Sequence, residues 1–481
     1  MNRFRSLFLL SIPVLALGSV FLLYGLLSLL LFHDQIHLPF FTLAAAMLAI
    51  GVAALFGLTR RLENVSYRES LLFVTLTWII LGVLGGLPFM WINGLSFTDA
   101  TFESVSGITA TGATVITGLD GLPKTLLLYR QFLHWMGGLG VIIFVVAIMP
   151  MLNIGGMRLY KAETPGPVKG EKLAPRISHT ARYLWYVYLV ITLACVVAFW
   201  LAGMSLFDAV AHAFATVSTG GFSTHDASFS YFNSATIEAV AMVFMLLGAM
   251  NFGLHFVVFN NRRLSMYWRD EETRWLLGII LSAIVVATLC IWAEGDYDLL
   301  TSLRHSAFQV ISFITSTGFF STDYTVWPGA VILLLVILQY VGGCAGSTSG
   351  GNKVVRNAIT MKAIFLEVKY LIHPRGVFSL KFNRRPVDRD VMDSVKAYMF
   401  CAAALTVLLT LLLMATGLDF LTALSGVSAS LNVGGVAFGA VGSNFIPLND
   451  VATWILTATM ILGRLEFFTV LVLLHPAFWR R

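Results

Sequence analysis

The chain has 481 residues, of which 58% are hydrophobic and 12% charged, and its formal net charge is +6. Soluble proteins carry about 25% charged residues, so a water-soluble fold could not hide this much apolar side chain. The basic residues are scattered over several short loops instead of one face, which excludes a nucleic-acid-binding protein. All four cysteines lie in apolar stretches without metal-ligand spacing or a paired framework, so we expect no disulfides.

Windows of about 20 apolar residues, each able to cross roughly 30 Å of hydrocarbon, recur from end to end. We therefore expect an all-α polytopic protein embedded in a lipid bilayer. The expected spans are residues 6–32, 38–58, 71–93, 125–152, 183–204, 235–260, 275–293, 329–352, 394–416 and 450–474. The first window follows Arg3 and Arg5, as in a cleaved signal peptide, but its apolar run is too long for one and favours a retained helix.

The charged residues predict the orientation in the membrane. If the N-terminus is cytoplasmic, the inside loops contain Arg60 and Arg61; Arg158, Lys161, Lys169, Lys172 and Arg176; Arg262, Arg263 and Arg269; and the block from Lys353 to Arg389. This agrees with the positive-inside rule and also makes the C-terminus cytoplasmic. The outside segments hold the acids Asp120, Asp226, Glu294, Asp296, Asp298, Asp323 and Asp450. They would form a cation-concentrating ring around an outer mouth or be ordinary solvated acids.

Four outside segments are too short and too apolar to be ordinary loops. Each is a short half-helix followed by a turn rich in Thr, Ser and Gly, at residues 102–113, 210–221, 308–319 and 424–435. Their glycines Gly112, Gly220, Gly318 and Gly434 recur at intervals of 108, 98 and 116 residues, which indicates an internal repeat. Each unit enters from the cytoplasm, dips back from outside and returns, so the units share one orientation.

These segments predict a fold of four parallel helix–pore loop–helix repeats around a pseudo-four-fold pore axis, preceded by two extra N-terminal transmembrane helices. The expected division of the chain is 1–66 for the N-terminal hairpin, and 67–155, 156–262, 263–375 and 376–481 for the repeats. Such an arrangement brings the four turns together at the axis. Non-helical backbone survives at membrane depth only where it is buried or lines a watery cavity.

The four turns are expected to form a selectivity filter. Backbone carbonyls of an extended segment replace the water around a cation without placing full charges in the pore. The expected ion-binding residues are Ala110, Thr111 and Gly112; Ser218, Thr219 and Gly220; Ser316, Thr317 and Gly318; and Asn432, Val433 and Gly434. A single such glycine is as well explained by helix packing or a turn. Four in register, all outside, favour the filter.

The helix after the third turn is interrupted by residues rich in glycine and hydroxyl groups. At 1.5 Å per residue, a helix from Gly329 reaches Gly343 after about 21 Å, still inside the bilayer. The expected gate comprises Gly342, Gly343, Cys344, Ala345, Gly346, Ser347, Thr348, Ser349, Gly350, Gly351 and Lys353. A phosphate-binding loop is rejected because neither its lysine spacing nor a preceding strand is present. A simple packing kink remains an alternative to the gate.

Ionisable residues inside other spans are candidates for function, because a charge at that depth is costly. Arg464 lies about 21 Å along the last helix, near the depth of the glycine-rich interruption. Glu466 is two residues away and does not face it, so a partner on another helix or the cytoplasmic interface is the alternative to a role in the pore. Glu103 is positioned to meet Arg130, which shares a helix face with His134. We interpret these three residues as structural pairing around the filter, with direct ion binding as the alternative.

With these turns, interruption and arginine, the chain resembles the Trk/Ktr/HKT superfamily of K⁺ transporters, and within it the bacterial TrkH/TrkG subfamily. The helices before residue 60 match an extra pair of that subfamily. The resemblance implies K⁺ as the transported ion, one filter glycine per repeat, an intramembrane gating loop and a pore-facing Arg464. It also implies a homodimer and a separate cytoplasmic nucleotide-binding ring of the TrkA type. Asn432 and Val433 depart from the Ser/Thr-Gly pattern, so the filter is not expected to be four-fold exact.

The predicted function is potassium uptake across the bacterial cytoplasmic membrane through a gated, channel-like pore. A secondary carrier that rocks around a central site is the rival interpretation, but such carriers usually show inverted repeats, whereas this repeat is parallel. A membrane enzyme would need a nucleophile, base and acid or a metal cluster, and the sequence assembles none of these sets. We expect no cofactor in the chain.

Overall fold

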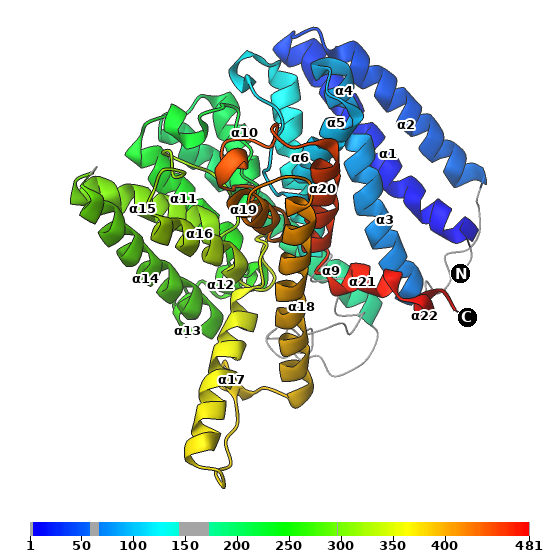
Figure 1. The fold of residues 1–481 in the computed structure, drawn as a ribbon. Helices are drawn as coiled ribbons and strands as arrows, with labels where there is room; N and C mark the ends of the chain where they lie inside the picture. The colour runs from blue at the N-terminus through cyan, green and yellow to red at the C-terminus, as the bar shows by residue number, and fades with distance from the viewer. Residues whose placement is uncertain (1–2, 58–66, 144–172, 296, 481) are drawn as a thin grey trace.

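The computed structural model describes residues 3–57, 67–143, 173–295 and 297–480, and most of them are helical (Figure 1). Several residues of the sequence argument lie outside the described residues: Arg60, Arg61, Arg158, Lys161, Lys169, Lys172 and Asp296, with the ends of the expected spans 38–58 and 125–152.

The chain begins with two long helices at one edge of the molecule. Helix α1 (Arg3–Leu27) continues into the π-helical turn η1 (Ser28–Phe32), and α2 (His37–Gly57) packs along α1. Both are blue in Figure 1, and the two ends of the described chain lie close together in every view. This pair is the expected N-terminal hairpin.

Four units follow, each with an outer helix, a short pore helix and an inner helix. The first contains α3 (Tyr67–Gly85), α4 (Leu87–Asn93), α5 (Phe97–Thr109), η2 (Leu119–Gly121) and α6 (Lys124–Ile143). The second contains α9 (Leu173–Leu201), α10 (Leu206–Val217), η4 (Ser228–Tyr231), α11 (Ala235–Ala249) and α12 (Phe252–Asn261).

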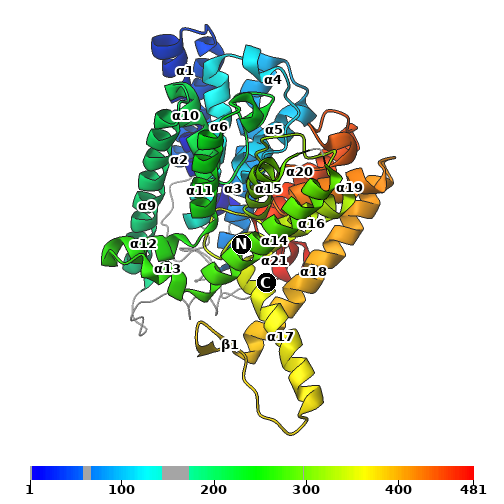
Figure 2. The ribbon, with the colours of Figure 1, turned by 90° about the vertical axis from the view of Figure 1, so that its left-hand side faces the viewer.

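The third unit contains α13 (Ser265–Arg269), α14 (Glu271–Glu294), α15 (Leu299–Ile314), α16 (Gly329–Val341) and α17 (Val354–Ile372). The fourth contains strands β1 (Lys381–Phe382) and β2 (Arg385–Pro386), then α18 (Arg389–Met414), α19 (Phe420–Leu431), η5 (Gly439–Val441), α20 (Asp450–Arg464), α21 (Phe468–Leu474) and α22 (Pro476–Trp479). The two strands pair antiparallel, Lys381 opposite Pro386 and Phe382 opposite Arg385. Helix α17 and this hairpin project beyond the helices around them (Figures 1 and 2).

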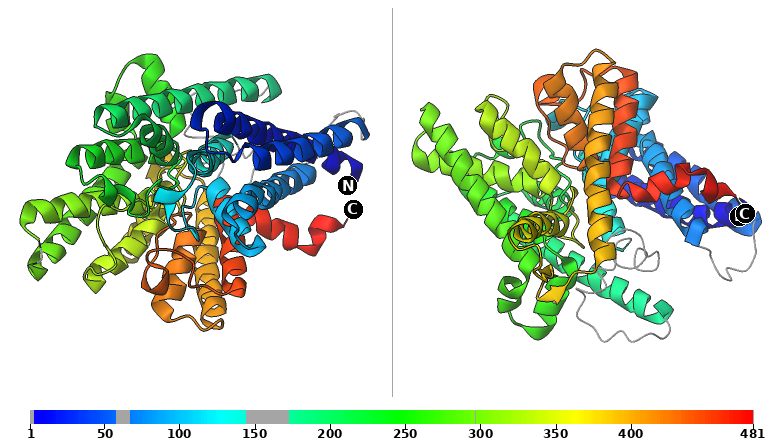
Figure 3. Two further views of the ribbon diagram at one scale, coloured as in Figure 1. Left: turned by 90° about the horizontal axis from the view of Figure 1, so that it is seen from above. Right: turned by 60° about the horizontal axis from the view of Figure 1, so that its bottom comes forward.

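The units close into a ring. The inner helix of each unit packs on the pore helix of the next: α6 on α10, α11 on α15, α16 on α19, and α20 back on α5. Seen from above, the units follow one another around a common centre (Figure 3). The expected fold is confirmed: four parallel helix–pore loop–helix repeats around a pseudo-four-fold axis, with two extra N-terminal helices.

Two of the expected spans are not continuous helices, so the prediction was wrong in this respect. Within the described residues six helices are long and apolar enough to cross a membrane, or eight if each bent pair is one span. The expected span 235–260 is bent by 101° between α11 and α12, and the expected span 450–474 is bent by 114° between α20 and α21. At the first bend the side chain of Asn251 accepts hydrogen bonds from the backbone N–H groups of Gly253 and Leu254, which starts a new helix there.

The pore helices begin at capping residues and end at the axis. Ser96 caps α5 by accepting a hydrogen bond from the N–H of Asp99 and donating one to its carboxylate, and Ser205 and Asp208 repeat this arrangement on α10. Because the C-terminal end of a helix carries partial negative charge, the four C-termini direct a potential toward the axis that favours a cation.

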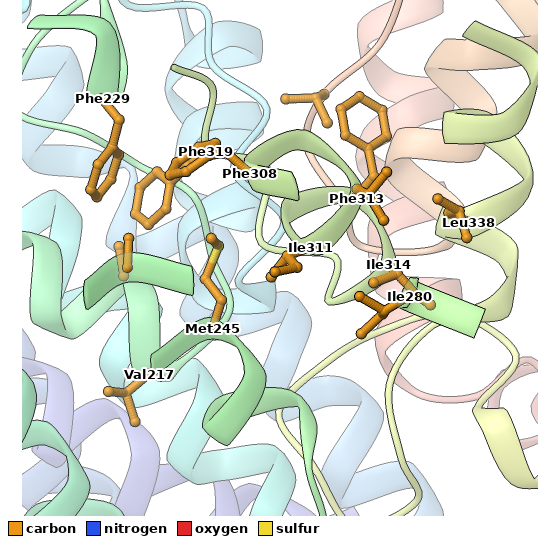
Figure 4. Close-up of a cluster of buried hydrophobic side chains, with 14 of the residues drawn as sticks. Val217, Phe229, Met245, Ile280, Phe308, Ile311, Phe313, Ile314, Phe319 and Leu338 are labelled. Atoms are coloured by element: carbon orange, nitrogen blue, oxygen red, sulfur yellow. The ribbon is translucent and has the colours of Figure 1, made fainter. Parts of the chain in front are cut away.

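A buried apolar cluster holds the third pore helix in place. Phe308, Phe313 and Ile314 of α15 are fully buried, and side chains from neighbouring helices, such as Met245 of α11 and Leu338 of α16, surround them (Figure 4). Close packing of this kind resists displacement, because even a small shift forfeits many dispersion contacts. The segment that follows α15 is therefore held by a closely packed core.

Candidate ion pore

Each pore helix is followed by a segment with the same unusual backbone. A residue just past the helix end adopts positive φ, and so does the glycine two residues later. The pairs are Ala110 (φ 55°) with Gly112 (φ 91°), Thr219 (52°) with Gly221 (85°), Ser316 (51°) with Gly318 (83°), and Val433 (55°) with Gly435 (68°). Alternation of this kind lets successive carbonyl groups of a segment point the same way, as a filter of carbonyl oxygens requires.

The four segments touch in sequence around the axis. A Cβ added at Gly112 would collide with the carbonyl oxygen of Gly220, one at Gly221 with that of Thr317, one at Gly318 with that of Gly434, and one at Gly435 with that of Thr111. Each glycine therefore packs against the carbonyl of the next repeat, and the fourth closes on the first. Glycine is needed at these positions for two reasons, the positive φ and the absence of space for a side chain.

The backbone places the second and fourth repeats one residue away from the register expected from the sequence. Thr111, Gly220, Thr317 and Gly434 each donate a backbone hydrogen bond to the carbonyl five residues earlier, so these four are equivalent. The positive-φ glycines equivalent to Gly112 and Gly318 are consequently Gly221 and Gly435, neither of which was among the expected ion-binding residues. Both follow the chosen glycine directly, and the Gly-Gly pairs at 220–221 and 434–435 were the available signal.

A cavity of about 170 Å³ lies next to the four segments, and it is lined by all four positive-φ glycines, Gly112, Gly221, Gly318 and Gly435. Among the expected outside acids that the structure describes, Asp226 is the one that lines this cavity. Asp226 also accepts hydrogen bonds from the N–H groups of Gly118 and Leu119, which ties the second repeat to the first. Asp120 contacts His225 instead. Their arrangement is that of structural clamps more than of a ring of free charges.

The expected pairing of Glu103 and Arg130 is confirmed. Nε of Arg130 lies 2.6 Å from Oε1 of Glu103, and both side chains are buried. Glu103 also accepts hydrogen bonds from the Thr114 hydroxyl and the Val115 N–H beyond the first filter segment. Nη1 of Arg130 donates to the Ser223 carbonyl beyond the second. The pair thus holds two filter segments from behind.

The interruption after α16 lies directly beneath the filter. The Thr348 hydroxyl donates to the carbonyl oxygens of Val217 and Gly248, and the Gly350 N–H donates to the Ser316 hydroxyl at 2.6 Å. A Cβ added at Gly350 would collide with the Asn432 carbonyl. Residues 342–353 therefore contact the filter segments of the second, third and fourth repeats.

Arg464 approaches this loop from the last α20 turn. Its Nη1 donates to the Thr348 carbonyl at 2.8 Å and its Nη2 to the Gly137 carbonyl at 3.2 Å. The side chain is buried, and within the described residues it has no carboxylate partner. Glu466 pairs with Arg356 at 2.6 Å. A cationic group therefore lies against the loop without a carboxylate partner among the described residues.

Comparison with known proteins identifies the family. The family model described as "TrkH: Cation transport protein" matches residues 37–481. The chain is 44% identical to the Trk system potassium uptake protein TrkH of Vibrio parahaemolyticus over 99% of this chain and 100% of the relative. It is 40% identical to the Trk system potassium uptake protein TrkG of Escherichia coli over 96% of each. The chain belongs to the TrkH family.

A solved structure supports the same assignment. The crystal structure of the potassium transporter TrkH from Vibrio parahaemolyticus matches with a TM-score of 0.92 at 40% identity, and the match covers 100% of both chains. The family resemblance expected from the turns, the loop and Arg464 is thus confirmed. The relatives are named as uptake transporters, which agrees with the expectation that this TrkH-family chain is not an enzyme.

In this TrkH-family chain a further residue, not selected from the sequence, joins the loop to the start of the helix that follows it. Oε1 of Glu272, buried at the start of α14, accepts hydrogen bonds from the N–H groups of Ala345 at 2.7 Å and Val355 at 3.2 Å. At the loop's end, Nζ of Lys353 donates to the carbonyl of Ser349. Tandem acids before a span, as at Glu271 and Glu272, were the only signal in the sequence.

Proposed function

We propose that this chain takes up K⁺ across the bacterial cytoplasmic membrane through a channel-like pore. The observation that carries the proposal is the closed ring of filter segments, in which each positive-φ glycine packs on a carbonyl of the next repeat. The printed names of the relatives, potassium uptake proteins, support K⁺ as the cargo. The ion is the substrate, and no cofactor enters the proposal.

The proposed ion ligands are backbone carbonyls of Ala110, Thr111 and Gly112 and their counterparts in the other repeats. The other residues of the set are Ser218, Thr219 and Gly220; Ser316, Thr317 and Gly318; and Asn432, Val433 and Gly434, with Gly221 and Gly435 added from the backbone register. A wall of neutral oxygens replaces the hydration shell of a monovalent cation and lets it leave again, because it binds the ion without a full opposite charge.

The proposed gate is residues 342–353 together with Arg464. The loop supplies steric closure beneath the filter, and its hydrogen bonds to Val217 and Ser316 support this position. The guanidinium group supplies repulsion to a cation that has passed the filter, since it is buried and meets carbonyl oxygens in place of a carboxylate. Opening requires the loop to leave both the filter and Arg464.

The proposed assembly is a homodimer whose cytoplasmic face binds a nucleotide-binding ring of the TrkA type. The basic inner loops and the projecting α17 support a cytoplasmic docking face, with both termini on that side. Purification from native membranes tests the proposed assembly with the cytoplasmic ring. Recovery of the chain without any cytoplasmic partner, together with nucleotide-insensitive flux, would contradict that assembly.

We also propose the division of the chain into a hairpin of residues 1–66 and repeats 67–155, 156–262, 263–375 and 376–481.

The filter is tested by ion flux into vesicles that contain the purified chain. We expect ⁸⁶Rb⁺ uptake to be blocked by external K⁺ far more than by Na⁺, and Gly318→Ser to remove this preference, because Gly318 packs against the Gly434 carbonyl. Gly417→Ser is the matched control: Gly417 also has positive φ, but a Cβ there meets nothing within 4 Å. Unchanged preference in Gly318→Ser would overturn the proposed filter.

A further inference from the structure

A basic hollow opens at the end of α14 that lies away from the outer cavity. It has a volume of about 600 Å³ and is lined by Trp268, Arg269, Glu271, Arg274, Asn383 and Arg384. These residues come from α13, the start of α14 and the hairpin between β1 and β2, which lie near one another below the pore (Figures 1 and 2). The hollow is therefore at the boundary where a membrane span begins.

An apolar groove continues from the hollow along α14. It has a volume of about 460 Å³ and is lined by Glu271, Arg274, Trp275, Gly278, Ile279 and Ser282. Glu271 and Arg274 line both cavities, so the two adjoin each other. Gly278 opens the floor of the groove, because a Cβ added there meets nothing within 4 Å. A basic hollow joined to an apolar groove on a membrane span has the shape and polarity of a headgroup site joined to an acyl-chain site.

The positive charge of the hollow is available to a ligand. The side chains of Arg269, Arg274 and Arg384 are exposed, and none has an ion-pair or side-chain hydrogen-bond partner among the residues that the structure describes. The neighbouring acids are engaged elsewhere: Glu271 with Lys362 and the Asn383 N–H, and Asp270 with Thr273 and the Asn383 amide. Trp268 is 68% exposed, as an aromatic ring at a membrane interface is.

We propose that this hollow and groove bind one anionic phospholipid. Its phosphate lies among Arg269, Arg274 and Arg384, and one acyl chain follows α14 past Gly278. Three uncompensated guanidinium groups favour an anionic over a zwitterionic headgroup, because each basic side chain near an anionic surface strengthens binding by a factor of about five. The groove favours a lipid over free phosphate, since free phosphate leaves the apolar surface exposed to water.

The site adjoins the residues that hold the loop. Glu271 lines both cavities, and the next residue, Glu272, accepts hydrogen bonds from Ala345 within the loop and Val355 at the start of α17. Lys362, which pairs with Glu271, belongs to α17, the helix that directly follows the loop. Bound lipid thus fixes the start of α14 against α17. Its effect on flux rests on the proposed gate, whereas its binding does not.

Lipid binding is measured on the purified full chain by native mass spectrometry with added phosphatidylglycerol or phosphatidylcholine. We expect the intact chain to retain phosphatidylglycerol preferentially. Arg274→Gln with Arg384→Gln should weaken the first phosphatidylglycerol by roughly 30-fold and leave phosphatidylcholine unaffected, because two basic groups are lost. Arg262→Gln with Arg263→Gln is the matched control, since both arginines are exposed near the same interface but outside the hollow.

Gly278→Leu tests the groove without disturbing the fold, because its side chain enters open space and leucine favours a helix over glycine. It should weaken retention of both lipids. Equal retention of both lipids by the intact chain, no effect of either change, or competition by inorganic phosphate alone would overturn the lipid site. Unchanged lipid retention with a change in oligomeric state would assign the groove to a second copy. Loss of a co-purifying cytoplasmic protein alone would assign the hollow to that protein. Flux is recorded in parallel. Loss of lipid preference with unchanged K⁺ selectivity would contradict the lipid site alone, whereas loss of K⁺ selectivity with intact lipid binding would contradict the pore alone.

Discussion

Nη1 of Arg464 donates a hydrogen bond of 2.8 Å to the carbonyl oxygen of Thr348, which joins the end of α20 to the loop after α16. The contact connects residues 116 positions apart in the chain. It is a bond between a permanent cation and a backbone dipole, so moving the loop leaves a buried charge with one partner fewer. The hydrogen bond therefore stabilises this position of the loop.

Replacing Arg464 by alanine should raise ⁸⁶Rb⁺ flux per folded molecule by at least about tenfold in vesicles without any cytoplasmic partner. Removing a fixed charge from a poorly hydrated passage lowers the barrier by more than ~1.4 kcal/mol at the effective dielectric of a protein. Lys396→Ala is the control, since Lys396 is 59% exposed on α18. Equal or reduced flux for Arg464→Ala would remove Arg464 from the barrier.

The filter register is tested by comparing Gly434→Ala with Gly435→Ala. Gly435 has φ of 68° and its added Cβ would meet the Thr111 carbonyl, whereas Gly434 has no positive φ and its added Cβ would lie 3.2 Å from Nε2 of Gln339, a much smaller overlap. The left-handed conformation alone costs alanine about 1–2 kcal/mol. Gly435→Ala should therefore lose K⁺ over Na⁺ preference and Gly434→Ala keep most of it. The reverse order would restore the register expected from the sequence.

Arg130→Met should destabilise the protein strongly, because it leaves Glu103 buried without its partner. Breaking one side of a buried ion pair costs about 3–5 kcal/mol, whereas replacing both partners is often nearly neutral. Thermal unfolding, monitored by size-exclusion chromatography, should show a much lower melting temperature for Arg130→Met than for wild type. The double variant Arg130→Met with Glu103→Gln should recover part of this loss of melting temperature. A double variant as unstable as the single one would indicate that Arg130 acts through Ser223 and Phe222 instead.

His225 should make the outer face more stable at low pH. Burial disfavours its charged form, but the Asp208 carboxylate, 3.4 Å from Nε2, and a hydrogen bond to Asp120 outweigh burial and raise the pKa of His225 above its usual value. The stabilisation is therefore complete below about pH 6.5 and is lost as the pH rises through the raised pKa. The melting temperature of wild type should exceed that of His225→Gln at pH 6, and the difference should shrink by pH 8.5. A constant difference would exclude protonation as its cause.

Much of the architecture was predictable from local properties of the chain. A bilayer requires long apolar spans and internally bonded backbone, so hydropathy alone indicated the membrane class, and short apolar segments on one side indicated the pore loops. The four-fold repeat followed from the spacing of four Gly-containing turns. The pairing of Glu103 with Arg130 was expected because both ionisable groups lie in apolar surroundings and require a partner.

The remaining features depended on contacts between distant segments. Asn251 has a local capping role, yet whether the helix bends there depends on the space that its neighbours leave. The choice of Gly435 over Gly434 depends on the carbonyl of Thr111 in the first repeat, and the partners of Arg464 belong to the first and third repeats. Hydropathy and spacing are properties of residues that are close in the sequence. Positive φ, hydrogen-bond partners and the hydrogen bonds of Glu272 to Ala345 and Val355 arise only when the four repeats pack into a ring.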